Sequence, residues 1–442
     1  MVAAVRFGTD GIRGRAHDEV TVDVAYRLGW AVAQVLATTV YVGYDTRESS
    51  PELAAAVLAG LSAGGAPAMN LGLFTTPGVA VIASQRHGAG VVVSASHNPY
   101  YDNGLKVLGV GGAKLDVATE EAITTALALA PSPSAPPVAV PVDLGAEDEY
   151  LDHLRALVPV DLSGLHVVVD CANGAASHVA PALFSGTGAR LTVLHDRPDG
   201  RNINEGCGST DVSDLVATVL ALGADLGLAF DGDADRLVAV DHRGHVRDGD
   251  DLMVLFALDR ASRGELGGGL VVTTMSNLGL RRALGAADIT VRETEVGDRN
   301  VMVALEEVAW RLGGEQSGHV VFADVAPTGD GLLTALTLCE LISRRGPLFD
   351  QADAAWRRVP QSLVNVAKSD FDADVVDALF DELVTRYAVT GDEVRLLVRP
   401  SGTEPVVRVM IESTDERVVT EFTERLQAHF RGPGSVKGPR VG

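Results

Sequence analysis

Two short stretches combine residue types that could transfer phosphate. An apolar strand over residues 90–93 stops at Ser94-Ala-Ser-His-Asn-Pro99, which presents Ser96 at the strand end. A second apolar strand, residues 224–230, runs into Asp231-Gly-Asp-Ala-Asp-Arg236, whose three alternating carboxylates suit a hard divalent cation. Open α/β sheets place their chemistry at such strand ends. Together the two stretches suggest a serine that carries phosphate beside a magnesium ion.

Each motif also has an ordinary interpretation when it is taken alone. A Ser-His pair at a strand end is more often a turn, because Ser and Asn hydrogen-bond their own backbone there. An Asp-x-Asp-x-Asp run is commonly a solvated loop or a calcium site. The run in this chain lacks the Gly and Glu of an EF-hand loop and follows a strand instead of a helix. The magnesium prediction therefore depends on finding both motifs in one chain.

Length and charge limit the possible functions. At 442 residues the chain is long enough for three or four domains, and a hydrophobic content of 46% supports several cores. The net charge of −23 comes from 36 Lys and Arg against 59 Asp and Glu. Such a surface repels nucleic acid and anionic lipid, so we expect neither as a partner. A phosphate-binding site here requires arginines gathered locally.

The cysteines and the N-terminus indicate an intracellular protein. Cys171, Cys207 and Cys339 are odd in number and widely spaced, which predicts buried reduced thiols and neither a disulfide framework nor a zinc pattern. The N-terminus shows no signal peptide, and no apolar stretch reaches membrane length. We therefore expect a soluble cytoplasmic protein.

The same unit of apolar strand, polar turn and helix recurs along most of the chain. This pattern predicts three consecutive α/β domains with mixed, mostly parallel sheets, followed by a smaller C-terminal α+β domain. A proline-rich linker over residues 130–137 precedes an amphipathic helix over residues 147–158. The expected domains are residues 1–145, 146–249, 250–360 and 361–442.

The C-terminal part has a different pattern. Strands are expected over residues 363–367, 393–398 and 406–412, with a helix between the first two. A final helix is expected to open with the capping box Ser413-x-x-Glu416.

Three glycine-rich turns could bind a ligand. Phe7-Gly-Thr-Asp-Gly-Ile-Arg-Gly14 places Arg13 among glycines, and Arg399-Pro-Ser-Gly-Thr-Glu-Pro405 is followed by Arg408. Backbone amides in such turns and guanidinium groups bind phosphate. Gly313-Gly-Glu-Gln-Ser-Gly-His319 is acidic, and its Glu and Ser side chains could hold sugar hydroxyls. Each turn alone is typical of an ordinary surface loop.

Taken together, these motifs resemble those of the α-D-phosphohexomutases over essentially the whole chain. Three details favour the branch that acts on glucosamine phosphates: the form of the N-terminal motif, Gln316 where relatives often have Met, and the run from Asn202 to Thr210. Asn300 is a departure, because Tyr is expected there. The motifs occur in the expected order: Phe7–Gly14, Ser94–Pro99, Asp231–Arg236, Gly314–His319 and Arg399–Thr403.

The resemblance implies a phosphoserine enzyme. Ser96 is similar to the serine that exchanges a phosphoryl group with the sugar phosphate, through a bisphosphate that turns over within the cleft. Its phosphate oxygen and three carboxylates would hold one Mg²⁺. Lys106 matches a lysine proposed as general acid or base. The remaining implied residues are the metal ligands Asp231, Asp233 and Asp235, and the phosphate-steadying Arg13, His97 and Arg236.

The resemblance also implies how the sugar phosphate is held. Glu315, Ser317 and His319 match the sugar-binding loop of the third domain. A clamp on the C-terminal domain would bind the phosphate that is not transferred, and closure of this domain over the central cleft would exclude water. The clamp residues are Arg399, Ser401, Gly402, Thr403 and Arg408.

We therefore expect an intramolecular phosphotransferase that interconverts glucosamine 6-phosphate and glucosamine 1-phosphate, with a hexose 1,6-bisphosphate as activator. In bacteria the resemblance places this step in the supply of UDP-N-acetylglucosamine and peptidoglycan precursors. Three alternatives stay open: a glucose or mannose phosphate mutase, a magnesium phosphohydrolase with an aspartyl nucleophile such as Asp231, and a sugar-phosphate sensor without turnover. No partner interface can be read from the sequence, and a homodimer is the assembly that we allow for.

Overall fold

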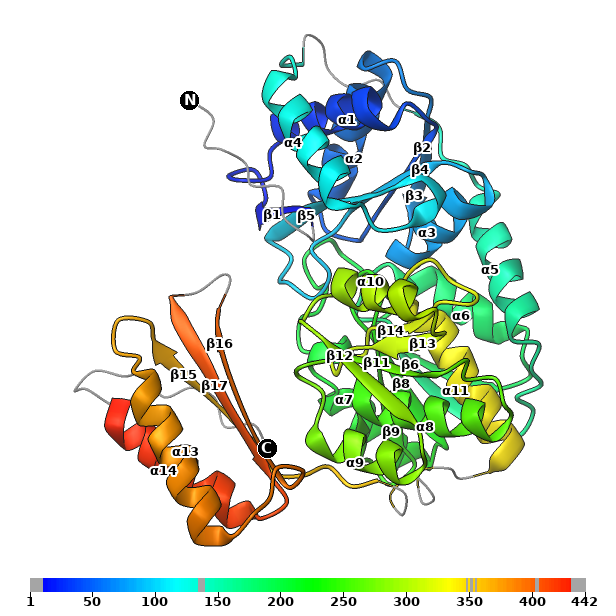
Figure 1. The fold of residues 1–442 in the computed structure, drawn as a ribbon. Helices are drawn as coiled ribbons and strands as arrows, with labels where there is room; N and C mark the ends of the chain where they lie inside the picture. Colours follow the sequence, from blue (N-terminus) through cyan, green and yellow to red (C-terminus); the bar gives the residue numbers. More distant parts are fainter. Residues whose placement is uncertain are drawn as a thin grey trace.

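The computed structural model describes residues 11–133, 140–346, 349, 353, 356–401 and 405–430. Four β-sheets follow one another along the chain, and helices cover them (Figure 1). No helix within these ranges is long and apolar enough to cross a membrane.

The first sheet has the strand order β1-β5-β4-β2-β3. Strand β2 pairs in parallel with β3 and β4, whereas β5 runs antiparallel to β4 and β1. Side chains alternate across the sheet, so Val91 and Val93 belong to one core with α1, α2 and α4, and Val92 packs with α3 on the other face. The elements are β1 (Ile12–Arg15), α1 (Val22–Leu36), β2 (Val40–Tyr44), α2 (Ser50–Ala63), β3 (Ala68–Leu73), α3 (Thr76–Gln85), β4 (Ala89–Val93), β5 (Asp102–Leu108), η1 (Val110–Gly112) and α4 (Val117–Leu129).

The second sheet repeats this arrangement with the order β10-β9-β8-β6-β7. Strand β6 is parallel to β7 and β8, and β9 returns antiparallel to β8. The elements are α5 (Ala146–Leu157), β6 (His166–Asp170), α6 (Ala176–Ser185), β7 (Arg190–Leu194), η2 (Gly208–Thr210), α7 (Ser213–Leu222), β8 (Leu226–Phe230), β9 (Leu237–Asp241) and β10 (Val246–Arg247).

The third sheet has four strands in the order β12-β11-β13-β14, with β11 parallel to β12 and β13 and with β14 antiparallel to β13. Its core is continuous with that of the second sheet, since one cluster of buried side chains extends from α3 through α6 and α8 to α11. The elements are α8 (Gly249–Ser262), β11 (Gly269–Thr273), α9 (Leu278–Ala286), β12 (Thr290–Thr294), α10 (Asp298–Val308), β13 (Leu312–Gly314), β14 (Val320–Phe322) and α11 (Gly331–Arg345).

These three sheets place three loops at equivalent positions. In each sheet, the third strand of a parallel trio is followed by an antiparallel neighbour, and one loop joins the two. The loop from β4 to β5 carries Ser96, the loop from β8 to β9 carries Asp231–Asp235, and the loop from β13 to β14 carries Glu315–Ser317. The repeated topology therefore brings the predicted serine, metal and sugar motifs to the same kind of sheet edge.

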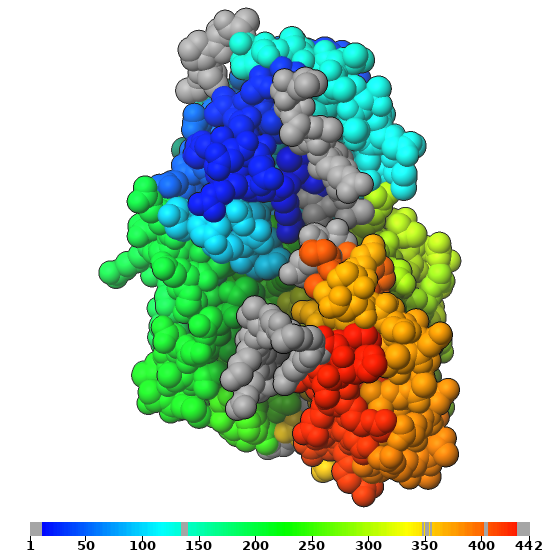
Figure 2. Space-filling view, turned by 90° about the vertical axis from the view of Figure 1, so that its left-hand side faces the viewer, coloured from blue at the N-terminus to red at the C-terminus, as the bar shows by residue number. Residues whose placement is uncertain are grey.

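The C-terminal domain has a core of its own. Its sheet, in the order β15-β17-β16, is antiparallel throughout, and α13 and α14 contribute buried residues such as Leu383 and Phe422 to the core. Figure 2 shows this domain, orange to red, as a separate body beside the green second domain. The elements are β15 (Gln361–Ala367), α13 (Ala373–Tyr387), β16 (Val394–Pro400), β17 (Val406–Ser413) and α14 (Glu416–Phe430).

The predicted fold class, three α/β domains and a smaller α+β domain, is confirmed, with two differences in detail. The first two sheets were expected to be mostly parallel, but each has two parallel and two antiparallel strand pairings. The predicted capping box is wrong, because Ser413 ends β17 and the carboxylate of Asp415 accepts the Arg417 backbone N–H instead. The three cysteines are buried and free, as expected. Residues 134–137 of the proline-rich linker lie outside the described residues.

Candidate active site

Ser96 lies just beyond the end of β4 with its hydroxyl directed at the second domain. Its backbone is left-handed, with φ 50°, a conformation that non-glycine residues adopt at a cost. The hydroxyl donates to a carboxylate oxygen of Asp231 at 2.5 Å and lies 3.3 Å from His97 Nδ1. The residue is 2% exposed. A buried, strained serine thus faces the acidic cluster that follows β8.

A buried ion pair holds the loop between β4 and β5, which carries Ser96 and is called the serine loop below. Arg47 and Asp45, both at the end of β2, are 1% exposed and pair at 2.9 Å. The guanidinium donates to the carbonyl oxygens of Ser96 and Asn98, at 2.9 Å each. Asp45 accepts from the hydroxyl of Ser94 at 2.6 Å, and this hydroxyl accepts the Ser96 backbone N–H. The side chains at the end of β2 therefore hold the neighbouring strand end in place.

Asp231, Asp233 and Asp235 form a buried carboxylate cluster. One oxygen from each residue lies within 4.8 Å of the others. The Oδ1 atoms of Asp233 and Asp235 are buried and have no hydrogen-bond partner within the described part of the chain. Unpaired buried carboxylate oxygens are costly, and a hard divalent cation with oxygen ligands relieves that cost. The cluster fits such an ion.

The charges around this cluster are strongly coupled. Burial, together with Asp233 and Asp235, raises the pKa of Asp231 well above its ordinary value. Burial also acts to raise the pKa of Asp235, but Lys106 and His319 outweigh it and hold that pKa well below the usual range. Lys106 lies 3.4 Å from both Asp233 and Asp235; burial opposes its charge, but these carboxylates raise its pKa above the ordinary value. The two carboxylates therefore favour the cationic form of Lys106.

His97 is a neutral imidazole beside the serine. Burial, and after it the charges of Arg236 and Arg13, lower its pKa to about 4. Arg236 lies at the end of the carboxylate loop, where its backbone N–H donates to Asp231 and its guanidinium is 3.7 Å from Asp235. The charges of two guanidinium groups thus act on the imidazole that lies beside the Ser96 hydroxyl, an arrangement that suits a dianionic phosphate.

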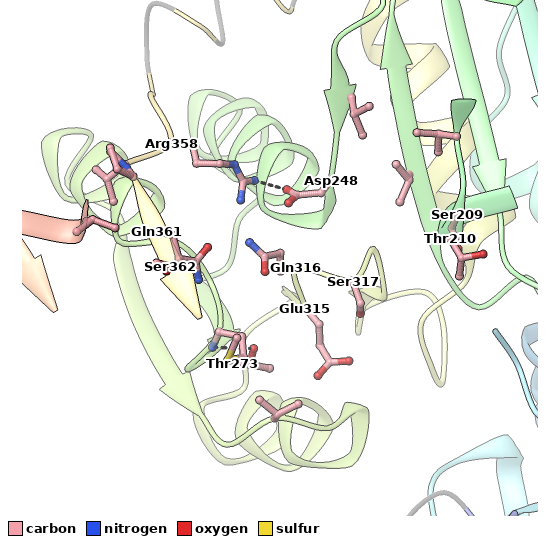
Figure 3. Close-up of a pocket in the computed structure, with 18 of the residues that line it drawn as sticks. Ser209, Thr210, Asp248, Thr273, Glu315, Gln316, Ser317, Arg358, Gln361 and Ser362 are labelled. Atoms are coloured by element: carbon pink, nitrogen blue, oxygen red, sulfur yellow. Dashed lines mark hydrogen bonds and ion pairs between the residues drawn. The ribbon is translucent and has the colours of Figure 1, made fainter. Parts of the chain in front are cut away.

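A cavity of about 1190 Å³ lies between the second, third and C-terminal domains. Figure 3 shows Glu315 and Ser317 in its middle, between Ser209 on one side and Gln361 on the other. A carboxylate oxygen of Glu315 accepts the Gly297 backbone N–H at 2.9 Å, which fixes the side chain toward the cavity. The loop of the third sheet therefore presents acceptor and donor groups that suit sugar hydroxyls.

Arg399 and Arg408 face each other directly across the strand pair β16–β17. Like charges at opposed positions repel, and burial together with Arg408 lowers the pKa of Arg399. An anion between them would offset this repulsion. Ser401 follows at the end of β16, whereas Gly402 and Thr403 lie outside the described residues, as does the N-terminal motif before Gly11.

Comparison with known proteins assigns the family. Four parts of the chain match successive domains described as Phosphoglucomutase/phosphomannomutase: alpha/beta/alpha domain I over residues 4–131, domain II over 148–244, domain III over 248–359 and the C-terminal domain over 363–429. Phosphoglucosamine mutases of Desulforudis audaxviator and Rhodococcus jostii are each 45% identical over 95% of this chain, and the match covers 96% and 98% of their own lengths. The chain belongs to the phosphohexomutase superfamily, in its phosphoglucosamine mutase branch.

Solved structures agree with this phosphohexomutase fold. A phosphoglucomutase/phosphomannomutase family protein from Burkholderia thailandensis has a TM-score of 0.80 at 25% identity and matches 97% of both chains. N-acetylphosphoglucosamine mutase from Aspergillus fumigatus, in complex with GlcNAc-6P and magnesium, has a TM-score of 0.67 at 19% identity and matches 96% of this chain and 95% of its own. The chain is therefore an isomerase by family.

Within this phosphohexomutase, the structure brings the three predicted metal ligands together with other predicted residues. Ser96, Lys106 and Arg236 each lie against one or more of the three aspartates, and His97 lies beside Ser96. His319 lies with them: it is 2% exposed and 3.8 Å from Asp235, so it lies behind the metal cluster and not in the sugar cavity. Asn300 lies in the first turn of α10, where its amide donates to the carbonyl of Val296, a residue that lines the cavity.

Three nearby residues were not predicted. Arg47 and Asn204 bind the serine loop, and Thr76 donates to Asp233 at 2.6 Å. Arg47 had a detectable signal, since Asp45-Thr-Arg47 follows an apolar strand as the other motifs do. Thr76 follows β3 by three positions without an acidic or basic residue to mark the turn, and Asn204 lies in the run from Asn202 to Thr210, which suggested only the sugar branch and no contact to Ser96.

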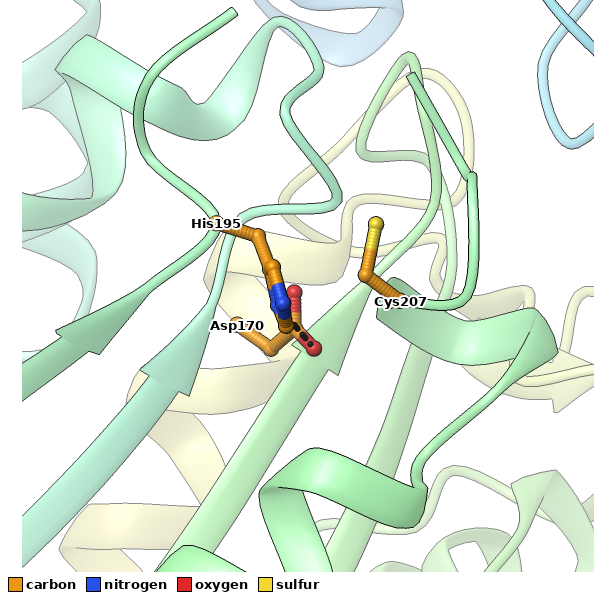
Figure 4. A group of neighbouring side chains, drawn as sticks. All are labelled: Asp170, His195 and Cys207. Carbon is orange, nitrogen blue, oxygen red and sulfur yellow. Dashed lines mark ion pairs between the residues drawn. The ribbon is translucent and has the colours of Figure 1, made fainter. Parts of the chain in front are cut away.

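A second group with metal-ligand chemistry comprises Asp170, His195 and Cys207, whose ligand atoms lie within 4.8 Å of one another (Figure 4). The Asp170 carboxylate already accepts the backbone N–H groups of Ala172 and Gly208, at 2.9 and 3.0 Å, and pairs with His195 at 3.0 Å. These contacts are those of an anchor that ties the loop after β7 to the end of β6.

Proposed function

We propose that this phosphohexomutase interconverts glucosamine 6-phosphate and glucosamine 1-phosphate through a phosphorylated Ser96. The observation that carries this proposal is the Ser96 hydroxyl, held in a left-handed turn 2.5 Å from Asp231 within a three-carboxylate cluster. Relatives named phosphoglucosamine mutase at 45% identity support the choice of sugar.

The proposed reaction consists of two successive phosphoryl transfers. The bond between phosphorus and Ser96 Oγ breaks as a bond forms to a free hydroxyl of the sugar phosphate, and that hydroxyl loses its proton. The bisphosphate turns in the cavity and returns its other phosphoryl group to Ser96, which restores the phosphoenzyme. Lys106 holds a proton beside the cluster, so we assign it as the general acid and base: in each transfer it gives this proton to the oxygen that loses phosphorus and takes one from the attacking hydroxyl.

Asp231, Asp233 and Asp235, with an oxygen of phosphorylated Ser96, would hold one Mg²⁺, which would neutralise charge on the transferring phosphoryl group. The purely oxygen donor set favours Mg²⁺ over softer metals. Arg13, His97 and Arg236 would steady the phosphoserine. His97 would do so as a neutral hydrogen-bond donor, in keeping with its lowered pKa.

The substrate would be held between two domains. Glu315 and Ser317 would bind hydroxyls that look alike in both orientations of the sugar, with His319 supporting Asp235 from behind. Arg399 and Arg408, with Ser401, Gly402 and Thr403, would clamp the phosphate that is not transferred. A hexose 1,6-bisphosphate would act as activator because it phosphorylates Ser96 directly.

The remaining proposals concern the whole protein. We keep residues 1–145, 146–249, 250–360 and 361–442 as the domain boundaries. We expect the protein to be cytoplasmic and to have neither a nucleic-acid nor a membrane partner. The assembly that we allow for is a homodimer.

An assay of purified protein with Mg²⁺ and a hexose 1,6-bisphosphate tests the choice of sugar. Glucosamine, glucose and mannose phosphates are compared side by side, and we expect the highest kcat/KM for glucosamine phosphate. Comparable values for glucose or mannose phosphate would overturn the specificity and keep the chemistry. Binding without turnover of any of the three would favour a sensor.

Intact mass measurement tests the nucleophile. After incubation with bisphosphate, the wild type and Asp231→Asn are expected to carry one phosphoryl group that Ser96→Ala lacks. Ser185→Ala changes an exposed serine on α6 and serves as the matched control. Phosphate that stays on Ser96→Ala and disappears from Asp231→Asn would instead indicate an aspartyl phosphate and a phosphohydrolase.

A further inference from the structure

Two donors from different domains bind the same pair of carbonyl groups around the phosphorylation site. Arg47 Nη2, from the first domain, lies 2.9 Å from the carbonyl oxygens of both Ser96 and Asn98. Asn204 Nδ2, from the second domain, lies 2.9 Å and 3.1 Å from the same two oxygens. The segment with the strained Ser96 is thus held from both sides.

The Asn204 side chain can do this in only one orientation. Both carbonyl oxygens are acceptors, so the NH₂ group must face them and the amide oxygen must face away. Asn204 itself has a left-handed backbone, with φ 58°, and its N–H donates to the carbonyl of Ala172 at 2.9 Å. Backbone and side chain together direct its amide at the serine loop.

The loop that carries Asn204 is itself anchored at the end of β6. The Gly208 N–H donates to Asp170, and the Asn173 amide donates to the Asn202 carbonyl at 3.3 Å. The carbonyl of Asn173 accepts from the hydroxyl of Thr46, which precedes Arg47, at 2.6 Å. The two donors therefore belong to one connected interface between the first and second domains.

The metal cluster belongs to the same rigid unit. Gly232, between Asp231 and Asp233, has no space for a side chain: an added Cβ would lie 2.6 Å from the Ser96 carbonyl oxygen and 3.0 Å from Asn204 Nδ2. Asn204 and Asp231 both come from the second domain, whereas Ser96 comes from the first. A donor that binds the serine loop from the second domain sets the position of Ser96 relative to the carboxylates.

We infer that Asn204 is a positioning residue for phosphoryl transfer, which clamps the carbonyls of Ser96 and Asn98 together with Arg47 and so aligns Ser96 with the carboxylate cluster. This inference rests on the proposed role of Ser96 as the phosphorylated residue. Asn204 acts on the transferred group through the peptide of Ser96, and its side-chain amide donates to the carbonyls of Ser96 and Asn98.

Steady-state kinetics of Asn204→Gly and Asn204→Asp test the inference. Glycine removes the amide and tolerates the left-handed backbone, whereas aspartate keeps the shape and replaces the donor by a carboxylate that repels both carbonyls. We expect kcat for glucosamine 6-phosphate to fall about 100-fold, since a misalignment near 1 Å costs that much. KM should stay within about two-fold, because no substrate-binding group changes.

Asn202→Ala is the matched control. Asn202 lies in the same loop and its amide donates to the carbonyl of Arg197 at 3.0 Å, so Asn202→Ala removes a side-chain hydrogen bond of the loop but keeps the anchoring Asn202 carbonyl and the Asn204 contact to Ser96. We expect a wild-type kcat for this variant. An equal fall in kcat for Asn202→Ala, or a rise in KM that accounts for the Asn204 effect, would overturn the inference.

The ³¹P NMR signal of the phosphoenzyme provides a readout that does not depend on turnover. With the clamp removed, the phosphoserine resonance is expected to shift and broaden, and it should be unchanged in Asn202→Ala. Unchanged kcat and an unchanged resonance in both Asn204 variants would overturn the inference while the wild-type mutase activity stands. A wild type without phosphate on Ser96 would overturn the proposed function and this inference together.

Discussion

At the scale of single residues, the conformation of the Ser96 loop depends on a buried arginine. Arg47 is fully buried, and its guanidinium neutralises Asp45 while it binds carbonyl groups of the loop. Removing one member of a buried pair leaves the other charge uncompensated, which is more costly than the pair is favourable. The structural requirement for Arg47 is therefore strong even though it touches no reacting atom.

Arg47→Met should lower the free energy of unfolding by about 3–5 kcal/mol, because Asp45 and the loop carbonyls lose their donor. Arg47→Lys should recover only part of this, since an ammonium group cannot reproduce the planar fork. Thermal unfolding measured by circular dichroism checks both variants. Arg201→Met is the control: Arg201 pairs with Glu48 on the surface, and we expect a free energy of unfolding close to that of the wild type. A similar loss in both arginine-to-methionine variants would contradict the argument.

Residues that follow an apolar strand could be predicted from the sequence, because type and spacing within a few positions are enough to suggest chemistry. Ser96 and the three aspartates are of this kind. Asn204 is not, because it lies 108 positions from Ser96 and no local pattern marks a side chain that reaches across a domain interface. The strained backbone of Ser96 is likewise visible only in three dimensions.

At the scale of elements, helix ends show how local geometry adds to stability. Helix α13 ends at Ala388, which is exposed and left-handed with φ 52°. An alanine in this conformation costs about 1–2 kcal/mol that glycine avoids. Ala388→Gly is therefore expected to stabilise the C-terminal domain by about 1 kcal/mol.

Inside the same helix, an alanine-to-glycine substitution should destabilise the domain instead of stabilising it. Ala378 is exposed in the middle of α13, where glycine is about 1 kcal/mol less favourable than alanine. Differential scanning calorimetry of Ala388→Gly and Ala378→Gly compares the two positions directly. Destabilisation by both substitutions would show that the left-handed end is not strained.

The N-terminus of α11 carries a pH dependence. Asp330 caps this helix by accepting two backbone N–H groups and also accepts the Tyr150 hydroxyl at 2.8 Å. Burial raises the pKa of Asp330 to about 6 from the ordinary 3.8. A carboxyl whose folded pKa is raised stabilises the fold fully below pH 3.8, and this contribution disappears as the pH rises through 6.

Asp330→Asn cannot ionise and keeps an oxygen for the cap. Its stability relative to the wild type should therefore increase between pH 4 and pH 7, by about 1–3 kcal/mol, when thermal unfolding is followed at each pH. Asp152→Asn changes a carboxylate whose side chain is 78% exposed, and its stability should depend on pH in the same way as that of the wild type. A difference between Asp330→Asn and the wild type that does not depend on pH would contradict the raised pKa.

Element types were predictable where periodicity is strong, but strand direction was not. Strands β4 and β8 were expected from their apolar runs, whereas β13, which ends in two glycines, and the antiparallel partners that follow each motif loop were not. Because an apolar run does not specify the direction of its neighbour, mostly parallel sheets were expected. The direction depends on loop length and on which sheet edge is free, and both are properties of the folded domain.

At the scale of the whole molecule, the C-terminal domain is attached differently from the other three. The first three sheets share a continuous core, whereas the C-terminal core is separate. Contacts near the connection are polar: the Asn277 amide exchanges hydrogen bonds with the Val359 backbone at 3.0 and 3.1 Å, and Arg395 donates to the Ser276 carbonyl at 2.7 Å. Polar interfaces of this kind permit domain motion, so this domain is the one suited to close over the cavity.

If the C-terminal domain closes onto a bound phosphate, then Arg399 is the group through which closure depends on the ligand. Arg399→Ala should raise KM for glucosamine 6-phosphate about 10- to 100-fold, the value of a charge-assisted hydrogen bond. In X-ray scattering we expect bisphosphate to decrease the radius of gyration of the wild type, and Arg399→Ala should abolish this decrease. Arg386→Ala, on α13 of the same domain, removes an equal charge that pairs with Glu382 and Glu421, and it should leave both measurements unchanged. An equal rise in KM for both variants would mean that net charge, and not the arginine pair of β16 and β17, attracts the phosphate.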